Sequence, residues 1–243
     1  MHRGAIVRVV TIGLLAAAVA TAVAILIPWL PAQESKEGGR IDFVFWFVVG
    51  ICIAVFAVVA AVTIYSVVRF RARPDDDSDG PPIHGHTGIE IAWTAIPTIL
   101  VTVIAILSAV ALAENGKLQS NRLRVEVTAQ QFAWHFKYPQ YGGLQSNELR
   151  LVEGRQVELQ LRALDVIHSF WVPEFRQKQD AVPGIVTQLT ITPTKVGERT
   201  LVCTELCGLG HALMRAPVYV MKPDAFDRWA QSQQQQGSEG TSG

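Results

Sequence analysis

Two long stretches without a charged residue set the first limit on what this chain can fold into. They run from Phe43 to Val68 and from Ile91 to Ala113. Each is longer than the roughly 20 apolar residues with which a helix crosses about 30 Å of hydrocarbon. We therefore expect a pair of membrane-spanning helices, joined by a polar loop, within residues 41–114.

A third apolar run, from Val9 to Leu30, lies near the N-terminus and follows Arg3 and Arg8. A basic start followed by an apolar core is typical of a signal peptide, and equally of an uncleaved first helix. Both interpretations of residues 1–32 stay open, so the sequence predicts two or three spanning helices.

Basic residues indicate how these helices are oriented. Arg69, Arg71 and Arg73 directly follow the first charge-free stretch. Because cytoplasmic loops carry the excess of Lys and Arg, the loop 69–90 is expected in the cytoplasm. Everything after Ala113 then lies on the outer face of the membrane.

Residues 115–230 have the pattern of an exported β domain. Short segments alternate between apolar and polar positions, with Gly or Pro between them, which predicts a small sandwich or barrel. The alternating apolar positions are Leu123, Val125, Val127, Val157, Leu159 and Leu161. A final helix is expected from about Asp224, with Phe226 and Trp229 on one face. The Gln-, Ser- and Gly-rich residues 231–243 are expected to form a disordered tail.

Charge and cysteine content narrow the function classes. The formal net charge is zero, which argues against nucleic acid as a partner, because phosphate neutralisation needs clustered Lys and Arg. Three cysteines are too few for a disulfide scaffold. Cys52 lies within an apolar stretch, where a thiol acts as a small hydrophobic group. Only Cys203 and Cys207 remain as candidates for a functional role, either as metal ligands or as an oxidised pair.

Four soft ligands lie within twelve residues. Gly208 and Gly210 between them cost a helix about 1 kcal/mol each relative to Ala, which favours a loop. Zinc sites do not use Met, whereas thiolates with imidazole and a weak thioether are typical of copper electron-transfer sites. A disulfide between the two cysteines is the alternative, but it explains neither the histidine nor the methionine. The four residues are Cys203, Cys207, His211 and Met214.

A second histidine must come from another part of the chain. His168 is the leading candidate, because one ligand of a β-type copper domain lies near a strand end and the others on a later loop. His135 is the competitor within the exported part. His84 and His86 are expected on the opposite side of the membrane.

The motif Cys-x-Glu-x-Cys-Gly-x-x-His-x-x-Met at residues 203–214 resembles the binuclear copper loop of cytochrome c oxidase subunit II. The resemblance extends to Asp165-Val-Ile-His168-Ser-Phe, to Asp180-Ala-Val-Pro-Gly184, to the aromatic segment 131–139 and to Glu90-Ile-Ala-Trp93-Thr. It covers about residues 41–230. It implies an α+β membrane protein, with two or three N-terminal transmembrane helices followed by a cupredoxin-like all-β sandwich.

The resemblance also implies a ligand set and a function. Two copper ions (copper A) would be bridged by two thiolates, and the Glu205 side chain would help bind magnesium at the boundary with subunit I. Electrons would pass from a cytochrome c, or a cytochrome c domain of a partner complex, to haem in subunit I. There oxygen is reduced to water and protons are pumped, in a bacterial plasma membrane with other oxidase subunits. The implied copper ligands are His168, Cys203, the Glu205 carbonyl, Cys207, His211 and Met214.

Three further residues have two interpretations. Phe132 stands where the family usually has a tryptophan that faces the donor, and Trp134 follows two residues later. Residues two apart on a strand share a face, so Trp134 is either the electron port or core packing. Glu90 is either a carboxylate favoured by a helix N-terminus or, as the resemblance implies, the mouth of a proton path.

Two other classes of protein remain for comparison. A quinol oxidase subunit would have a similar β domain that holds no metal, and is expected to lack the ligands found here. A copper-delivery or storage protein would account for the loop but not for Glu90, Trp93 and Thr94 at the start of a spanning helix.

Overall fold

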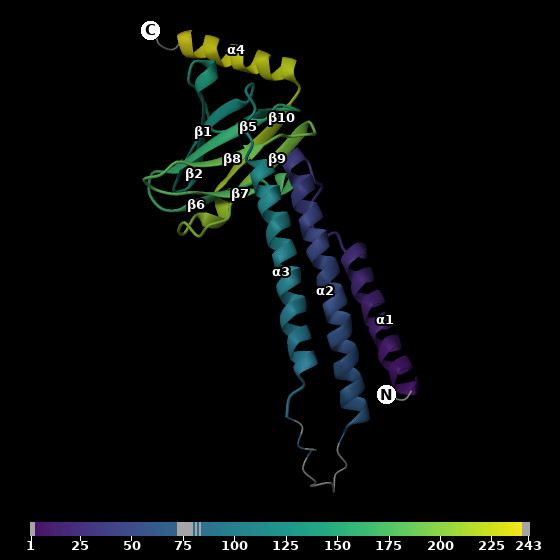
Figure 1. Cartoon of the computed structure of the whole chain (residues 1–243). Helices are drawn as coiled ribbons and strands as arrows, with labels where there is room; N and C mark the ends of the chain where they lie inside the picture. The colour runs from purple at the N-terminus through teal and green to yellow at the C-terminus, as the bar shows by residue number, and fades with distance from the viewer. Residues whose placement is uncertain (1–2, 72–79, 81, 83, 240–243) are drawn as a thin grey trace. The chain divides into compact units, whose positions relative to one another are not determined.

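The computed structural model describes residues 3–71, 80, 82 and 84–239. Much of the predicted cytoplasmic loop, including Arg73, therefore lies outside the described residues. The chain divides into two compact units (Figure 1). One contains Met1–Trp29 and Phe43–Ala109, and the other contains Leu30–Asp42 and Val110–Gly243.

The first unit consists of helices. The structure has three helices that are long and apolar enough to span a membrane, in the described part of the chain: α1 (Arg3–Leu26), α2 (Lys36–Arg69) and α3 (Thr87–Asn115). Gly13 of α1 packs closely on α2, because a Cβ there would lie 3.4 Å from the Ala61 Cβ. Small residues of this kind let two helix backbones approach in a membrane.

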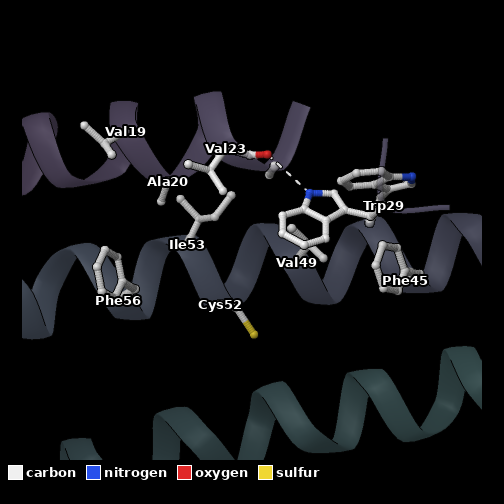
Figure 2. Close-up of a pocket in the computed structure, with 11 residues that line it drawn as sticks. Val19, Ala20, Val23, Trp29, Phe45, Val49, Cys52, Ile53 and Phe56 are labelled. Carbon is white, nitrogen blue, oxygen red and sulfur yellow. Dashed lines mark hydrogen bonds between the residues drawn. The ribbon is translucent and has the colours of Figure 1, made fainter. Parts of the chain in front are cut away.

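An apolar groove lies between α1 and α2 (Figure 2). Val23 and Trp29 line it from one side, and Val49, Cys52 and Phe56 from α2. The Trp29 indole N–H donates to the Val23 carbonyl at 3.2 Å, so its polar atom is satisfied. The Cys52 thiol is free and exposed on α2, and its sulfur points away from α1 in Figure 2.

The second unit contains two five-stranded sheets, with orders β3-β2-β1-β5-β8 and β4-β10-β9-β6-β7. With the three helices before it, this β-sandwich confirms the predicted fold class. The strands are β1 (Leu123–Gln130), β2 (Ala133–Tyr138), β3 (Leu144–Ser146), β4 (Leu149–Val152), β5 (Val157–Ala163), β6 (His168–Trp171), β7 (Lys178–Ala181), β8 (Thr187–Ile191), β9 (Gly197–Cys203) and β10 (Arg215–Met221).

The core of the sandwich follows from the alternation along its strands. Leu123, Val125 and Val127 of β1 are fully buried, while the residues between them are more exposed. β1 pairs in parallel with β5, where Val157 lies opposite Leu123. Both strands thus place their apolar side chains in one core.

Helix α4 (Pro223–Glu239) closes the chain's described part. Phe226 and Trp229 pack on the Tyr138 ring, with centroids 6.1 and 5.3 Å away. The helix continues through residues 231–239, where a disordered tail was predicted. Gln is a good helix former, and the Gln234 side chain donates to the Tyr141 carbonyl at 2.9 Å.

The start of α2 and the end of α3 belong to the second unit. Near the start of α2, the buried Glu37 carboxylate accepts hydrogen bonds from the Thr192 N–H and hydroxyl, at 2.7 and 2.8 Å. At the end of α3, the Asn115 side chain accepts a hydrogen bond from Arg40 at 3.0 Å. The Glu37 contacts join the start of α2 to the β-sandwich, and the Arg40 contact joins the start of α2 to the end of α3.

Candidate metal centre

Strand pairing brings the two halves of the candidate site together. His168 begins β6, and β6 pairs with β9, where Phe170 lies opposite Cys203. Beyond Cys203 the chain leaves the sheet and returns as β10 at Arg215. The backbone N–H of Cys203 donates to the Met214 carbonyl at 3.1 Å, which closes the loop at its base.

The two cysteines and His168 form a buried cluster. The Cys203 Sγ lies 3.9 Å from the His168 Nδ1 and 3.9 Å from the Cys207 Sγ. One ligand atom of each residue lies within 4.8 Å of the others. A disulfide has an S–S distance of about 2.05 Å, so the two thiols are free here.

The other predicted ligands lie around the same two sulfur atoms. The Cys207 Sγ is 3.6 Å from the His211 Nδ1 and 3.7 Å from the Met214 Sδ. The Glu205 carbonyl oxygen is 3.3 Å from the Cys203 Sγ. All six predicted ligand residues are therefore within reach of one centre, and they approach it from β6, β9 and a single loop.

His168 is oriented by an acidic neighbour. The Asp165 carboxylate accepts hydrogen bonds from the His168 Nε2 at 2.8 Å and from the backbone N–H groups of Gln131 and Val166, both at 2.7 Å. Burial raises the pKa of Asp165, but these hydrogen bonds outweigh it and lower the pKa below its usual value. An ionised carboxylate only accepts hydrogen bonds. The His168 Nε2 therefore carries the proton, which leaves Nδ1 free to bind a metal.

The thiols need a cation to become ligands. Burial, with the neighbouring Cys203, raises the pKa of the Cys207 thiol to about 11. Only a bound cation that displaces the proton makes such a thiolate stable at neutral pH. Two thiols, two imidazoles and a thioether are soft donors, and this set fits copper better than it fits zinc, calcium or magnesium.

The loop is shaped by its glycines, as the sequence indicated. Gly208 has a φ of +130°, which a side chain would strain. Gly210 lies against the Phe132 ring, since a Cβ there would come within 2.5 Å of it. The Gln131 side chain donates to the Cys207 carbonyl at 2.5 Å. We call residues 204–214, between β9 and β10, the ligand loop. The turn between β1 and β2 thus packs on the ligand loop.

Phe132 and Trp134 do not share a face. Phe132 lies in the turn before β2 and is 40% exposed, whereas Trp134 lies on β2 and is 2% exposed. The Trp134 ring packs edge-on against His168, with centroids 6.1 Å apart. The expectation that the two rings share a strand face was wrong because Phe132 is outside the strand. Phe132 is the residue at the surface, and Trp134 lies in the core behind the candidate ligand His168.

His135 is not part of the cluster. Its two ring nitrogens lie within hydrogen-bonding distance of the Gln130 and Asn147 side chains, at 3.1 and 2.9 Å. Both ring nitrogens are therefore occupied by the Gln130 and Asn147 side chains, and His135 links these two residues.

Glu90 lies in the first unit, in the first turn of α3. Its Oε1 accepts a hydrogen bond from the His86 backbone N–H at 3.0 Å, as a helix-capping carboxylate does. Thr94, Thr98 and Thr102 follow at four-residue intervals, and each hydroxyl donates to the carbonyl four residues earlier. These threonines form a polar stripe along α3, and their four-residue spacing in the sequence is the signal that marks it.

Two residues around the metal cluster were not predicted to act there. Gln131 and Asp165 connect the β1–β2 turn, His168 and the Cys207 carbonyl through the hydrogen bonds described above. Asp165 is part of the motif Asp165-Val-Ile-His168-Ser-Phe, but the sequence assigned no role to this carboxylate three residues before the candidate ligand His168. Gln131 gave no local signal, because the residue that it contacts is far along the chain.

The sequence matches two family models. One, cytochrome C oxidase subunit II, transmembrane domain, covers residues 32–110, and the other, cytochrome C oxidase subunit II, periplasmic domain, covers residues 145–221. Cytochrome c oxidase subunit 2 of Synechocystis sp. is 32% identical over 82% of this chain and 74% of its own length. The corresponding subunit of Thermostichus vulcanus is 34% identical over 84% of this chain and 78% of its own.

A solved structure is also similar to this chain. The crystal structure of the periplasmic domain of subunit II of cytochrome oxidase of Bradyrhizobium japonicum aligns with 26% identity and a TM-score of 0.47. The alignment covers 49% of this chain and 99% of that chain.

Proposed function

The chain belongs to the cytochrome c oxidase subunit II family, and from this premise we propose that it is the electron-accepting subunit of a respiratory haem–copper oxidase. It takes electrons from a cytochrome c at a binuclear copper site and passes them to haem in subunit I. Oxygen reduction and proton pumping then take place in that partner.

The convergence of a complete soft donor set on one buried point supports this proposal most directly. Cys203 and Cys207 would bridge the two metals, with His168, His211, Met214 and the Glu205 carbonyl as outer ligands. When bound, a copper pair that shares two thiolates spreads one electron over both ions and changes geometry little on reduction. Asp165 holds the His168 ring in the tautomer that presents Nδ1.

Three residues are assigned roles toward partners. Phe132 is the exposed aromatic of the β1–β2 turn, lies against the ligand loop and would contact the donor, while Trp134 packs on His168 from the core. The exposed Glu205 carboxylate would help bind magnesium at the boundary with subunit I. Glu90 would open a proton path into subunit I, in addition to capping α3.

The chain is a membrane protein, with a matched transmembrane domain and three apolar helices. We further propose that it lies in a bacterial plasma membrane, with the β-sandwich outside and the segment between α2 and α3 inside. Residues 1–32 would be retained as a third spanning helix, since Gly13 packs on Ala61 of α2. The N-terminal peptide mass of the purified subunit tests this retention.

Metal analysis of the purified oxidase tests the central proposal. We expect two copper ions per chain in addition to any in subunit I, and an electron paramagnetic resonance signal of one unpaired electron shared between two coppers. Zinc in the site, or the signal of a single isolated copper, would refute the binuclear assignment.

A further inference from the structure

A second pocket lies between α1 and α2, where the start of α1 and the end of α2 lie at the same end of the first unit (Figure 1). Its volume is about 420 Å³, and pockets that bind small ligands have about 300–1,000 Å³. Its lining includes Val7 and Arg8 of α1, and Tyr65, Val68 and Arg69 of α2. Both helices therefore contribute one arginine and one valine to the same pocket.

The polar side chains of this pocket are donors without an acceptor. An arginine is always charged, and its planar fork of N–H groups matches the geometry of a phosphate. In the described part of the chain, the Arg8 and Arg69 side chains form no ion pair or hydrogen bond, and the Tyr65 hydroxyl has no hydrogen-bond partner. The Phe70 ring packs edge-on against Tyr65, with centroids 6.2 Å apart, and lies 5.7 Å from the Arg69 guanidinium carbon. These aromatic contacts restrain the donors of α2 and leave their N–H and O–H groups unused.

The pocket has no carboxylate among its described lining residues. Within the described ranges of the first unit the acidic residue is Glu90, and its Oε1 accepts a hydrogen bond from the His86 N–H. The aspartates at 75–77 and 79 lie outside the described residues. The described walls of the pocket therefore suit an anion and have no group that would pair with a cation.

Apolar side chains flank the same donors. Val7 is 63% exposed and Val68 is 77% exposed, and both line the pocket. They belong to helices that are long and apolar enough to span a membrane, where lipid acyl chains would cover such side chains. In the proposed topology this end of the two helices faces the cytoplasm. Basic pockets between transmembrane helices on that side are typical binding sites for the headgroups of anionic lipids.

We propose that this pocket binds an anionic phospholipid. Arg8 and Arg69 donate to its phosphate oxygens, and Val7 and Val68 contact its acyl chains. This inference rests on the proposed retention of residues 1–32 and on the proposed topology, and it does not depend on the copper site.

Such a lipid would fasten α1 to the rest of the membrane unit. The matched transmembrane family model begins at residue 32, so α1 lies outside it. The close approach of Gly13 to Ala61 is a small contact between the two helices. A phosphate that accepts from one arginine of each helix would add charge-assisted hydrogen bonds between them.

Photocross-linking to the purified whole oxidase tests this proposal. The probe is a phosphatidylglycerol with a photoreactive group on one acyl chain, added to delipidated oxidase in a non-ionic detergent. We expect cross-linked peptides from the start of α1 and the end of α2. Unlabelled phosphatidylglycerol should displace the probe at a concentration about tenfold lower than phosphatidylcholine with the same chains, because two arginines favour a net anion. Millimolar inorganic phosphate should not displace it, because phosphate has no acyl chains.

Substitutions in the pocket give a second readout from the same cross-link. Arg8→Gln should weaken probe binding about tenfold, which corresponds to about 1.4 kcal/mol. Arg8→Lys should weaken it less, because an ammonium group keeps the charge but not the bidentate geometry. Tyr65→Phe removes one unpartnered hydroxyl and keeps the ring, and it should weaken binding roughly threefold. Arg71→Gln is the matched control with an effect below about twofold, because Arg71 is exposed and is not among the residues that line the pocket.

Four outcomes would overturn the lipid site. Equal displacement by the two phospholipids would mean that any lipid tail contacts this end of the helices, and displacement by inorganic phosphate would make it a site for free anions. Equal weakening by Arg8→Gln and Arg71→Gln would make the attraction a general effect of surface charge. A peptide mass that lacks residues 1–32 would remove one wall of the pocket. The binuclear copper signal of the same samples tests the proposed function separately, because no copper ligand belongs to α1 or α2.

Discussion

Replacement of Asp165 by asparagine removes the charge that orients His168 while it preserves the shape of the side chain. In the structure, one carboxylate oxygen accepts from Val166 and His168, and the other accepts from the Gln131 N–H. An asparagine has one oxygen and one NH₂ group. Whichever way it turns, a donor faces another donor, and at least one hydrogen bond is lost.

The magnitude follows from that lost bond. A hydrogen bond to a charged group contributes about 1.5–3 kcal/mol. Loss of an outer hydrogen-bond partner of a metal-bound histidine usually lowers metal affinity about 10–100-fold, which is about 1.4–2.8 kcal/mol. The two estimates agree, so we expect copper affinity to fall by one to two orders of magnitude in Asp165→Asn.

Competition with a copper chelator measures this affinity on the purified oxidase. Asp227→Asn is the control. Asp227 is exposed on α4, and this substitution removes the same charge far from His168 in the sequence. Thermal unfolding of the β-sandwich should be followed in parallel. A copper affinity of Asp165→Asn within twofold of the wild type, with an unchanged spectrum, would refute the role assigned to Asp165.

Three further predictions concern separate parts of the chain. Cys207→Ser should abolish the binuclear paramagnetic signal, and a wild-type signal in this variant would contradict the bridging role. Met214→Leu should keep copper but change its reduction potential, because a thioether is a weak ligand. Glu90→Gln should slow oxygen consumption under proton-limited conditions and leave the rate of copper reduction unchanged; normal turnover would return Glu90 to a capping role alone. Burial raises the pKa of Glu158, but hydrogen bonds from Arg122 and Gln160 and the charges of Arg122 and Arg124 outweigh burial and lower the pKa below its usual value of 4.5. A lowered pKa stabilises the fold above about pH 4.5, and this contribution is lost as pH falls through the folded-state value. The Glu158→Gln variant should therefore melt at a lower temperature than the wild type at pH 7, and its melting temperature should depend less on pH below 4.5. Melting curves that show the same loss of stability in acid for both proteins would contradict this.

The membrane helices and the ligand loop could be predicted because their signals are local. A charge-free stretch such as 43–68 needs no partner to be recognised, since bilayer thickness alone sets its length. The proposed ligands from Cys203 to Met214 lie close together in the sequence, and their softness as donors restricts which metal they would suit. The alternation in β1 predicted which side chains are buried, because a strand has a fixed two-residue period.

The failures came from contacts between distant residues. Phe132 and Trp134 were expected on one face, but a turn separates Phe132 from the strand, and no local pattern marks that boundary. Helix α4 was expected to end near residue 230. It continues because it lies beside Tyr141, whose carbonyl accepts a hydrogen bond from Gln234 across 93 positions of the chain.

The proposed ligands lie mostly in one local motif, whereas the contacts that hold them come from distant parts of the chain. The backbone of the ligand loop is tied down independently of its thiols, because Cys203 donates to the Met214 carbonyl and Thr204 to the Ser169 carbonyl. His168 is held at its outer nitrogen by Asp165 and flanked by the Trp134 ring. The proposed centre would exchange electrons, and such a centre must change little between its two redox states. The β-sheet would supply that restraint from strands that the ligand motif does not contain.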